Sequence, residues 1–176
     1  MAKKVISMTL SRESVQNAIK ELRSYQDSLE YKCRLLAEKL VEKGVEIARV
    51  QVADLDAVFT GELIQSIHSE YVGSVKGGAI FSVIADSSHA VFVEFGTGII
   101  GQESPYPGKL PDGVTWEYAS GKTIRQLADG RYGWFYPKDG KWYFTEGMPS
   151  RPFMYYTANE LRDLIAETAK EVFAVD

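Results

Sequence analysis

Residues 29–47 read LEYKCRLLAEKLVEKGVEI, and the spacing of their apolar side chains predicts a helix. The apolar stripe recurs every three or four residues, at Leu29, Cys33, Leu36, Leu40, Gly44 and Ile47. Ala37 and Val41 widen this apolar face, and glutamate, lysine and arginine fill the other side, as on the solvent face of an amphipathic helix. Gly44 lies inside the stripe, where glycine costs about 1 kcal/mol relative to alanine. We expect close packing against a neighbouring element, rather than a break in the helix, to explain this glycine.

Helical spacing also extends outward from this stretch in both directions. Toward the N-terminus, Ser11 is placed to cap a helix whose apolar face carries Val15, Ala18, Ile19 and Leu22, and residues 5–10 before it have the composition of a short strand. The two N-terminal stripes predict a long amphipathic helix, either continuous or in two parts. At the other end of the chain Pro152 begins a terminal helix with an apolar stripe at Met154, Ala158, Leu161, Ile165, Ala169 and Val172.

The centre of the chain has the composition of a small sheet. Residues 79–85 and 90–95 are rich in β-branched and aromatic side chains, and Asp86-Ser87-Ser88 between them favours a turn. A β-hairpin is expected here, with the alternative that the second run begins as a helical turn. Residues 60–67 mark a turn into an ordered element of unassigned type. Helices on either side of a small, mainly antiparallel sheet make an α+β fold.

Residues 96–150 differ in composition from the rest of the chain. They hold ten of the fifteen glycines, five of the six prolines and all three tryptophans. Two aromatic runs, 132–136 and 141–145, flank Pro137-Lys138-Asp139-Gly140 and predict a second β-hairpin. We therefore expect one domain over residues 1–176, with a core at about 11–98 and 148–173 and an inserted loop at about 99–147. The hairpin supplies a candidate interface, with the last four of these residues expected on one face: Tyr132, Trp134, Tyr136, Trp142 and Phe144.

Composition and charge limit the class of protein. A hydrophobic content of 45% and a charged content of 25% are those of a folded chain of 176 residues. The apolar runs are short and interrupted by charge, so no membrane-spanning helix or signal-peptide core is expected. The net charge is −4, with ten lysines and arginines against seven acidic residues up to position 53 and ten against seventeen after it. This balance gives no reason to expect sequence-specific binding of nucleic acid.

Few residues invite a catalytic or metal-binding interpretation. His68 and His89 have no partner at a metal-ligand spacing, and Cys33, the single cysteine, lies in an apolar stripe where a thiol is unreactive. Glu94 stands between apolar neighbours, where burial would raise its pKa, and a hydrogen-bonded structural role is favoured over a catalytic one. Its expected partners are an arginine or the backbone N–H groups of the turn at residues 96–98. We assign no catalytic residue, cofactor site or metal ligand.

Three separated stretches carry a resemblance to a known family. They are residues 60–67 (TGELIQSI), 90–97 (AVFVEFGT) and 149–154 (PSRPFM). Together and in this order they resemble the small tail-component proteins of long-tailed bacteriophages, which include head-tail connector, neck and tail-completion proteins. The resemblance spans roughly residues 11–173, and residues 99–147 are longer than the family pattern. The motif positions with an expected structural role are Thr60, Gly61, Leu63, Ser66, Ile67, Glu94, Phe95, Gly96, Thr97, Arg151, Pro152 and Phe153.

Structural roles account for the motif residues. Gly61 and Gly96 permit tight turns, while Thr60 and Thr97 are expected to satisfy local backbone N–H groups. The resemblance implies a structural virion protein of a phage or prophage, made in the bacterial cytoplasm and assembled at the head-tail junction. It implies a ring, expected to be sixfold, with portal-side and tail-tube-side proteins as neighbours and DNA passing through the ring.

Two other readings stay open at this point. Within the virion, a tail terminator or a minor capsid protein has the same motifs. From another class, Trp134 and Trp142 would suit a carbohydrate- or peptide-binding module. A hydrolase centred on Glu94 has less support, because no second carboxylate stands at a readable spacing.

Overall fold

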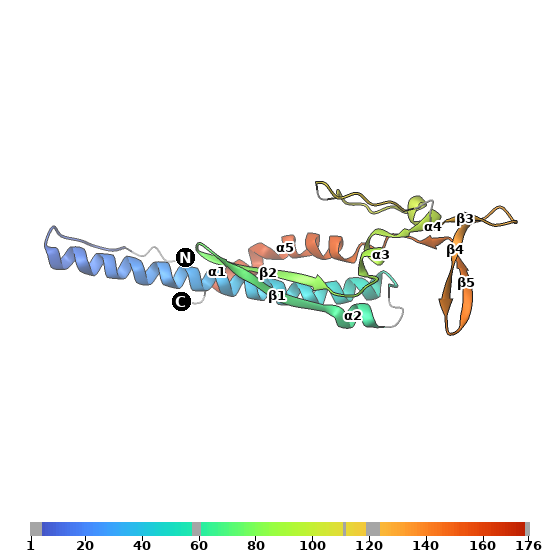
Figure 1. Ribbon diagram of the computed structural model, residues 1–176. Helices are drawn as coiled ribbons and strands as arrows, with labels where there is room; N and C mark the ends of the chain where they lie inside the picture. The colour runs from blue at the N-terminus through green and yellow to red at the C-terminus, as the bar shows by residue number, and fades with distance from the viewer. Residues whose placement is uncertain (1–4, 58–60, 111, 119–123, 175–176) are drawn as a thin grey trace. The chain divides into compact units, whose positions relative to one another are not determined.

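The computed structural model describes residues 5–57, 61–110, 112–118 and 124–174 (Figure 1). Its first element, α1 (Arg12–Asp54), is one helix of 43 residues, so the predicted long helix is confirmed and is continuous. Helices and small antiparallel sheets together make the expected α+β fold. The elements after α1 are α2 (Glu62–Ser66), β1 (Ile67–Val75), β2 (Gly78–Ala85), α3 (Ala90–Phe95), α4 (Gly98–Glu103), β3 (Arg125–Gln126), β4 (Tyr132–Lys138), β5 (Lys141–Thr145), β6 (Gly147–Met148) and α5 (Phe153–Ala174).

Both ends of α1 are capped. At the start, the Ser11 hydroxyl accepts the backbone N–H of Ser14 at 3.2 Å, which confirms the predicted cap. At the end, Asp56 adopts a left-handed conformation (φ 51°), and the N–H of Ala57 reaches back to the carbonyl of Val52 at 2.9 Å. This is the Schellman arrangement, which satisfies carbonyls that a helix end leaves open.

The strand predicted for residues 5–10 is wrong. No strand pairing is assigned to residues 5–10, which run beside the first turns of α1 in Figure 1. The N–H of Thr9 instead bonds the hydroxyl of Ser14 at 2.9 Å. A strand needs a neighbouring ladder, and β propensity alone does not provide one.

The chain divides into two compact units. One comprises residues 1–45, 69–84 and 160–176, and the other comprises residues 46–68 and 85–159. The first unit therefore contains most of α1, most of the β1–β2 pair and the greater part of α5. The second contains α2, α3, α4, the β3–β4–β5 sheet and the first turns of α5.

Gly44 lies in close contact with neighbouring elements of the first unit, where β1, β2 and α5 lie along α1 (Figure 1). A Cβ atom added at Gly44 would lie 2.8 Å from Val83 of β2 and 2.9 Å from Leu161 of α5. The expectation of close packing is confirmed, with side chains rather than backbone as the neighbours. A hydrogen bond of 3.2 Å from Lys43 to the hydroxyl of Thr168 adds a polar link between α1 and α5.

The buried face of α5 is rotated from the predicted stripe. Ile165 is 46% exposed and Ala158 is also exposed, although both were placed in the stripe. Two threonines are buried instead, Thr157 at 2% and Thr168 at 0% exposure. The Thr157 hydroxyl donates to the carbonyl of Phe153 at 2.7 Å, so this threonine can be buried with its hydrogen bond made.

The first predicted hairpin is wrong in its second half, because residues 90–95 form the helix α3. Its alternative, a helical turn, is the correct one. Ala90, Val93 and Glu94 are buried at helical spacing, whereas Val91 and Phe92 are more than two-fifths exposed. The helix stops at Gly96 (φ 78°). The real hairpin is β1 with β2, joined by two residues.

The aromatic hairpin is confirmed as β4 and β5. Asp139 (φ 51°) and Gly140 (φ 71°) form a two-residue turn in which both residues have positive φ, as in a type I′ turn. The register pairs Trp134 with Thr145 and Pro137 with Trp142.

The single aromatic face expected for this hairpin is wrong. Cross-strand partners share a face, and neighbours along a strand alternate between faces. Trp134 and Tyr136 therefore share one face with Tyr143, while Trp142 and Phe144 lie on the other. The two-residue turn causes this, because it pairs even-numbered residues of β4 with odd-numbered residues of β5.

Candidate functional site

Glu94 is a buried carboxylate in the second unit. The short helix α3 places it beside the start of α5, and only 7% of the residue is exposed. Its carboxylate accepts two backbone hydrogen bonds, from the N–H of Met154 at 2.9 Å and from the N–H of Tyr155 at 3.0 Å. These are first-turn N–H groups of α5, which have no partner inside the helix. Glu94 thus caps α5 from a distant part of the chain.

The position of these donors corrects one sequence expectation. An arginine or the N–H groups of the turn at residues 96–98 were expected to bind Glu94, and N–H groups of α5 bind it instead. A helix N-terminus carries partial positive charge, so a carboxylate is a favourable cap there. Burial nevertheless raises the pKa of Glu94, and the two N–H bonds only partly oppose that shift.

A shallow pocket adjoins Glu94. Its lining includes Phe95, Tyr106, Phe153 and Tyr155, together with the ammonium-bearing Lys109. Burial, and then the nearby charge of Glu94, raise the pKa of Tyr106. Both carboxylate oxygens of Glu94 are already hydrogen-bonded to backbone, so the arrangement suits a structural cap better than a proton-transfer site.

Hydrogen bonds to backbone carbonyls also join the second and third of the three sequence stretches, residues 90–97 and 149–154. The Ser150 hydroxyl donates to the carbonyl of Glu94 at 2.6 Å, and the N–H of Arg151 donates to the carbonyl of Val93 at 2.8 Å. An antiparallel bridge joins Thr97 to Met148. We call this assembly of residues 93–97 with residues 148–155 the motif junction.

Gly96 lies where the motif junction is tightest. Its φ is 78°, and an added Cβ atom would lie 2.6 Å from the backbone nitrogen of Ser150. Both the conformation and the space therefore require glycine at this position.

An aromatic cluster that the sequence analysis missed packs on the motif junction. The ring of Phe95 contacts Tyr106 at a centroid distance of 4.8 Å and Trp116 at 5.1 Å. The indole N–H of Trp116 donates to the carbonyl of Gly96 at 3.0 Å. The backbone N–H of Tyr106 in turn donates to the Tyr118 hydroxyl at 2.9 Å. The glycine and proline content of this region concealed the cluster, because its aromatic residues have no periodic spacing.

Other motif residues take up varied places. Phe153 is 1% exposed and begins α5, as expected of an anchor, and Pro152 before it is buried. The expected role of Thr97 is wrong: its buried hydroxyl oxygen has no hydrogen-bond partner in the structure. Thr60 lies outside the described residues.

Residues 61–67, from the first of the three sequence stretches, form the turn before α2, α2 itself and the start of β1. Gly61 precedes the helix with φ 77°, and Leu63 and Ile67 are 3% and 0% exposed. Ser66 donates its hydroxyl to the carbonyl of Leu63 at 2.8 Å. A guanidinium nitrogen of Arg49, on α1, donates to the carbonyl of Ile67 at 2.8 Å. These residues therefore have structural roles in the second unit.

The aromatic hairpin presents large side chains to solvent on both faces. On one face Trp142 is 69% and Phe135 is 52% exposed, and the ring of Phe135 contacts Phe144 at 5.3 Å. On the other, Tyr136 and Tyr143 are 38% and 42% exposed. Exposed tryptophan and tyrosine are enriched in protein interfaces, which keeps the hairpin a candidate interface.

The two histidines form hydrogen bonds with residues close to them in the sequence. His89 bonds the Ser87 hydroxyl at 2.9 Å, and His68 bonds the carbonyl of Ser66 at 2.8 Å. Cys33 is half-buried. Among the described residues no cluster of three or more histidine, cysteine or acidic side chains could hold a metal ion.

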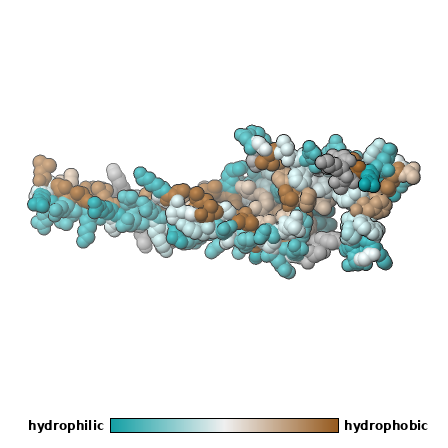
Figure 2. Space-filling view, viewed as in Figure 1, coloured by the Kyte–Doolittle hydropathy of each residue, from teal (hydrophilic) through white to brown (hydrophobic). Residues whose placement is uncertain are grey.

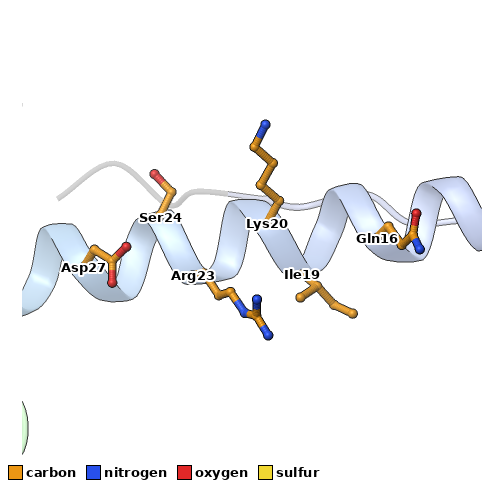
Figure 3. A pocket seen from close by; sticks show the side chains of 6 residues that line it. All are labelled: Gln16, Ile19, Lys20, Arg23, Ser24 and Asp27. Atoms are coloured by element: carbon orange, nitrogen blue, oxygen red, sulfur yellow. The ribbon is translucent and has the colours of Figure 1, made fainter.

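A second pocket runs along the first half of α1 (Figure 3). Lys20 and Ser24 point to one side of the helix, whereas Ile19 and Arg23 point to the other. Because its polar groups diverge, the pocket does not offer a convergent ligand site.

No protein-family model, curated protein or solved structure matches the chain. Within the described ranges, no helix combines the length and apolar character needed to cross a bilayer.

Proposed function

We propose that the chain is a structural protein of the head-tail junction of a tailed bacteriophage or prophage, where it forms part of a connector, neck or tail-completion ring. The motif junction is the observation that carries this proposal. Two of the three family motifs, separated by more than fifty residues of sequence, contact each other through Glu94 and the start of α5. A role in building the subunit accounts for these motif residues without any substrate.

The aromatic hairpin supports an assembly role. It projects from the same unit as the motif junction and leaves Trp142 and Phe135 more than half exposed. In a ring each subunit presents one surface to the next and a different surface to the previous one. A hairpin with aromatic side chains on both faces suits contacts with a ring neighbour or with an adjoining ring.

The test is electron microscopy of lysates from the phage or induced prophage with a stop codon at Trp116. The expected result is full heads beside separate tails of normal length, with complementation by the wild-type gene restoring joined particles. Overlong or ragged tails would indicate a tail terminator instead. Malformed heads would indicate a minor capsid protein. Intact, infectious virions would contradict a role at the junction.

The binding-module alternative makes a separate prediction. It requires tryptophan fluorescence of the purified protein to respond to an oligosaccharide or peptide ligand. Trp134 and Trp142 lie on opposite faces of the hairpin, so they cannot form one stacking platform, and this geometry counts against a two-tryptophan sugar site.

A further inference from the structure

In the first half of α1, three residues of the apolar stripe are exposed between Val15 and Cys33, which are half-buried. Ile19, Leu22 and Leu29 are 45%, 55% and 41% exposed, although they face the same side of the helix. Figure 2 shows hydrophobic residues along this part of the surface, where residues 5–10 also lie beside α1 (Figure 1). Isolated exposed apolar residues need no explanation, but a continuous stripe marks a contact surface.

The stripe has the spacing of a coiled coil. From Val15 to Leu40 its positions are 15, 19, 22, 26, 29, 33, 36 and 40, alternating steps of four and three residues without a break. Such a heptad repeat keeps a seam facing a second helix over its whole length. At about 1.5 Å per residue the seam is roughly 38 Å long. Gln26 is its one amide-bearing position, and a single polar residue in a seam fixes register and orientation.

We infer that this stripe pairs with the same stripe of a second copy of the chain, as an antiparallel two-helix coiled coil that makes the free protein a dimer. The inferred register places Leu22 opposite Cys33 of the second copy and Gln26 opposite Leu29. Because the contact is isologous, each pairing occurs twice. The inference concerns the free protein and does not depend on the proposed role in the virion.

Charge complementarity selects this register. Arg23 and Glu30 flank the seam on the same side, and the antiparallel register places each beside the other on the second copy. A shift of one heptad in one direction would bring Arg23 against Arg23, and a shift in the other would bring Glu30 against Glu30. A parallel, in-register pair would place Arg23 beside Ala18 and Glu30 beside Tyr25, with no ion pair. Charges at these flanking positions commonly set partner and orientation in coiled coils.

The surface at the end of the stripe is continuous with an apolar groove. Leu40 belongs both to the stripe and to a groove of the same unit whose wall includes Ile80 and Phe81 of β2. Ile80 is 44% exposed. In the inferred register Val15 of the second copy lies opposite Leu40, so its first turns extend the contact into this groove.

Cysteine cross-linking tests orientation and register together. Cys33 is the sole cysteine, and in the inferred register Cys33 of the two copies lie roughly 16 Å apart along the axis, too far for a disulfide. Leu22→Cys places a new thiol opposite the native Cys33 of the second copy, so mild oxidation should link the dimer covalently. Within one helix these two positions are also about 16 Å apart, so an internal disulfide cannot compete.

Val15→Cys is the matched control for cross-linking. It lies on the same stripe but, in the inferred register, about 10 Å along the axis from the nearest cysteine of the second copy. Covalent dimers of Leu22→Cys, with none of Val15→Cys or the wild type, are expected. Cross-linking of the wild type would mean parallel helices, and cross-linking of Val15→Cys would mean a register one heptad away. Either result would overturn the inference.

The mass of the free protein is the second test, measured by light scattering after size exclusion. The wild type should have twice the 19.7 kDa of the chain, and Leu22→Glu should halve that mass with the same circular dichroism. Lys20→Gln makes the same change of charge off the seam and should remain a dimer. A monomeric wild type, or a Leu22→Glu variant that stays dimeric, would refute the pairing. Arg23→Glu should weaken the dimer about tenfold, and adding Glu30→Arg should restore it.

Discussion

The carboxylate of Glu94 accepts a hydrogen bond of 2.9 Å from the backbone N–H of Met154, sixty residues further along the chain. Its second oxygen accepts the N–H of Tyr155. A capping residue normally lies next to the helix that it caps. Here the cap comes from α3, so the start of α5 is fixed by tertiary structure and ties two separated sequence motifs together.

Glu94→Gln tests the strength of this cap. A glutamine side chain has one carbonyl oxygen, so it can accept one of the two N–H groups and turns its own NH₂ toward the other. We expect the free energy of unfolding at neutral pH to fall by about 1–3 kcal/mol, measured by chemical denaturation. The exposed Glu103→Gln is the control and should change it by less than about 0.5 kcal/mol. Equal effects of the two substitutions would contradict the capping role.

The raised pKa of Glu94 predicts a pH dependence of stability. Because burial raises its pKa above the ordinary value of 4.5, the folded state retains the proton to a higher pH than the unfolded chain does. The proton-linked part of the contribution of Glu94 to stability is therefore fully present below that value and is lost as the pH rises through the raised pKa, whereas the part that comes from its two backbone hydrogen bonds is present at neutral pH. The stability advantage of the wild type over Glu94→Gln should grow as the pH falls from neutral toward 4.5. An advantage that stays constant, or shrinks, would argue against a raised pKa.

Gly44→Ala should destabilise the first unit although alanine favours helices. The added Cβ atom would lie within 3 Å of both Val83 and Leu161, and overpacking of this kind costs about 1–3 kcal/mol. The gain in helix propensity, about 1 kcal/mol, offsets only part of this. Gly73→Ala in β1 is the control, since no atom lies within 4 Å of its added Cβ atom. Thermal unfolding of both variants measures the loss of stability. Adding Val83→Ala to Gly44→Ala removes one of the two clashing side chains and should restore part of that stability.

Gly96→Ala should be more damaging than its backbone conformation alone explains. Gly113 has a similar φ, 84° against 78°, but an open surrounding. Gly113→Ala therefore measures the cost of a positive φ, and any excess for Gly96→Ala measures the clash with Ser150. We expect an excess of about 1–3 kcal/mol in the free energy of unfolding. If the two variants lost the same stability, the close contact at the motif junction would not matter energetically.

Trp142→Ala should separate assembly from folding. The side chain is 69% exposed, so its loss should change the free energy of unfolding by less than about 0.5 kcal/mol. Under the proposed function it should reduce the fraction of heads joined to tails, counted by microscopy after complementation of the stop-codon phage. Val114→Ala, 48% exposed, is the control and should complement fully. Full complementation by Trp142→Ala would remove that side chain from the proposed interface.

Periodic and local signals predicted much of the fold. The spacing of Leu29, Cys33, Leu36 and Leu40 predicted α1, because burial on one side imposes the helical period over many turns. The Asp139-Gly140 pair predicted the aromatic hairpin, because few residues tolerate two positive φ angles in succession. Both signals are local, because the residues that carry each one lie within the element that it predicts.

The errors arose where distant partners decide the outcome. Val91, Phe92 and Val93 have β propensity, but burial of Ala90, Val93 and Glu94 makes α3 a helix. The buried face of α5 was misplaced because Thr157 and Thr168 are polar in the sequence, and their buried hydroxyls bond Phe153 and Lys43. The aromatic cluster around Trp116 was missed because its contacts join irregular segments that no periodicity marks.

The turn at Asp139 and Gly140 determines more than the path of the chain. A three-residue turn that paired Lys138 with Trp142 instead of Lys141 would shift the register by one residue and exchange the faces of β5 relative to β4. Trp142 and Phe144 would then join Trp134 and Tyr136, and a hairpin that now offers aromatic rings in two directions would offer all four in one. The length of a single turn thus separates a strand pair suited to bridging two neighbours from one suited to gripping a single flat ligand.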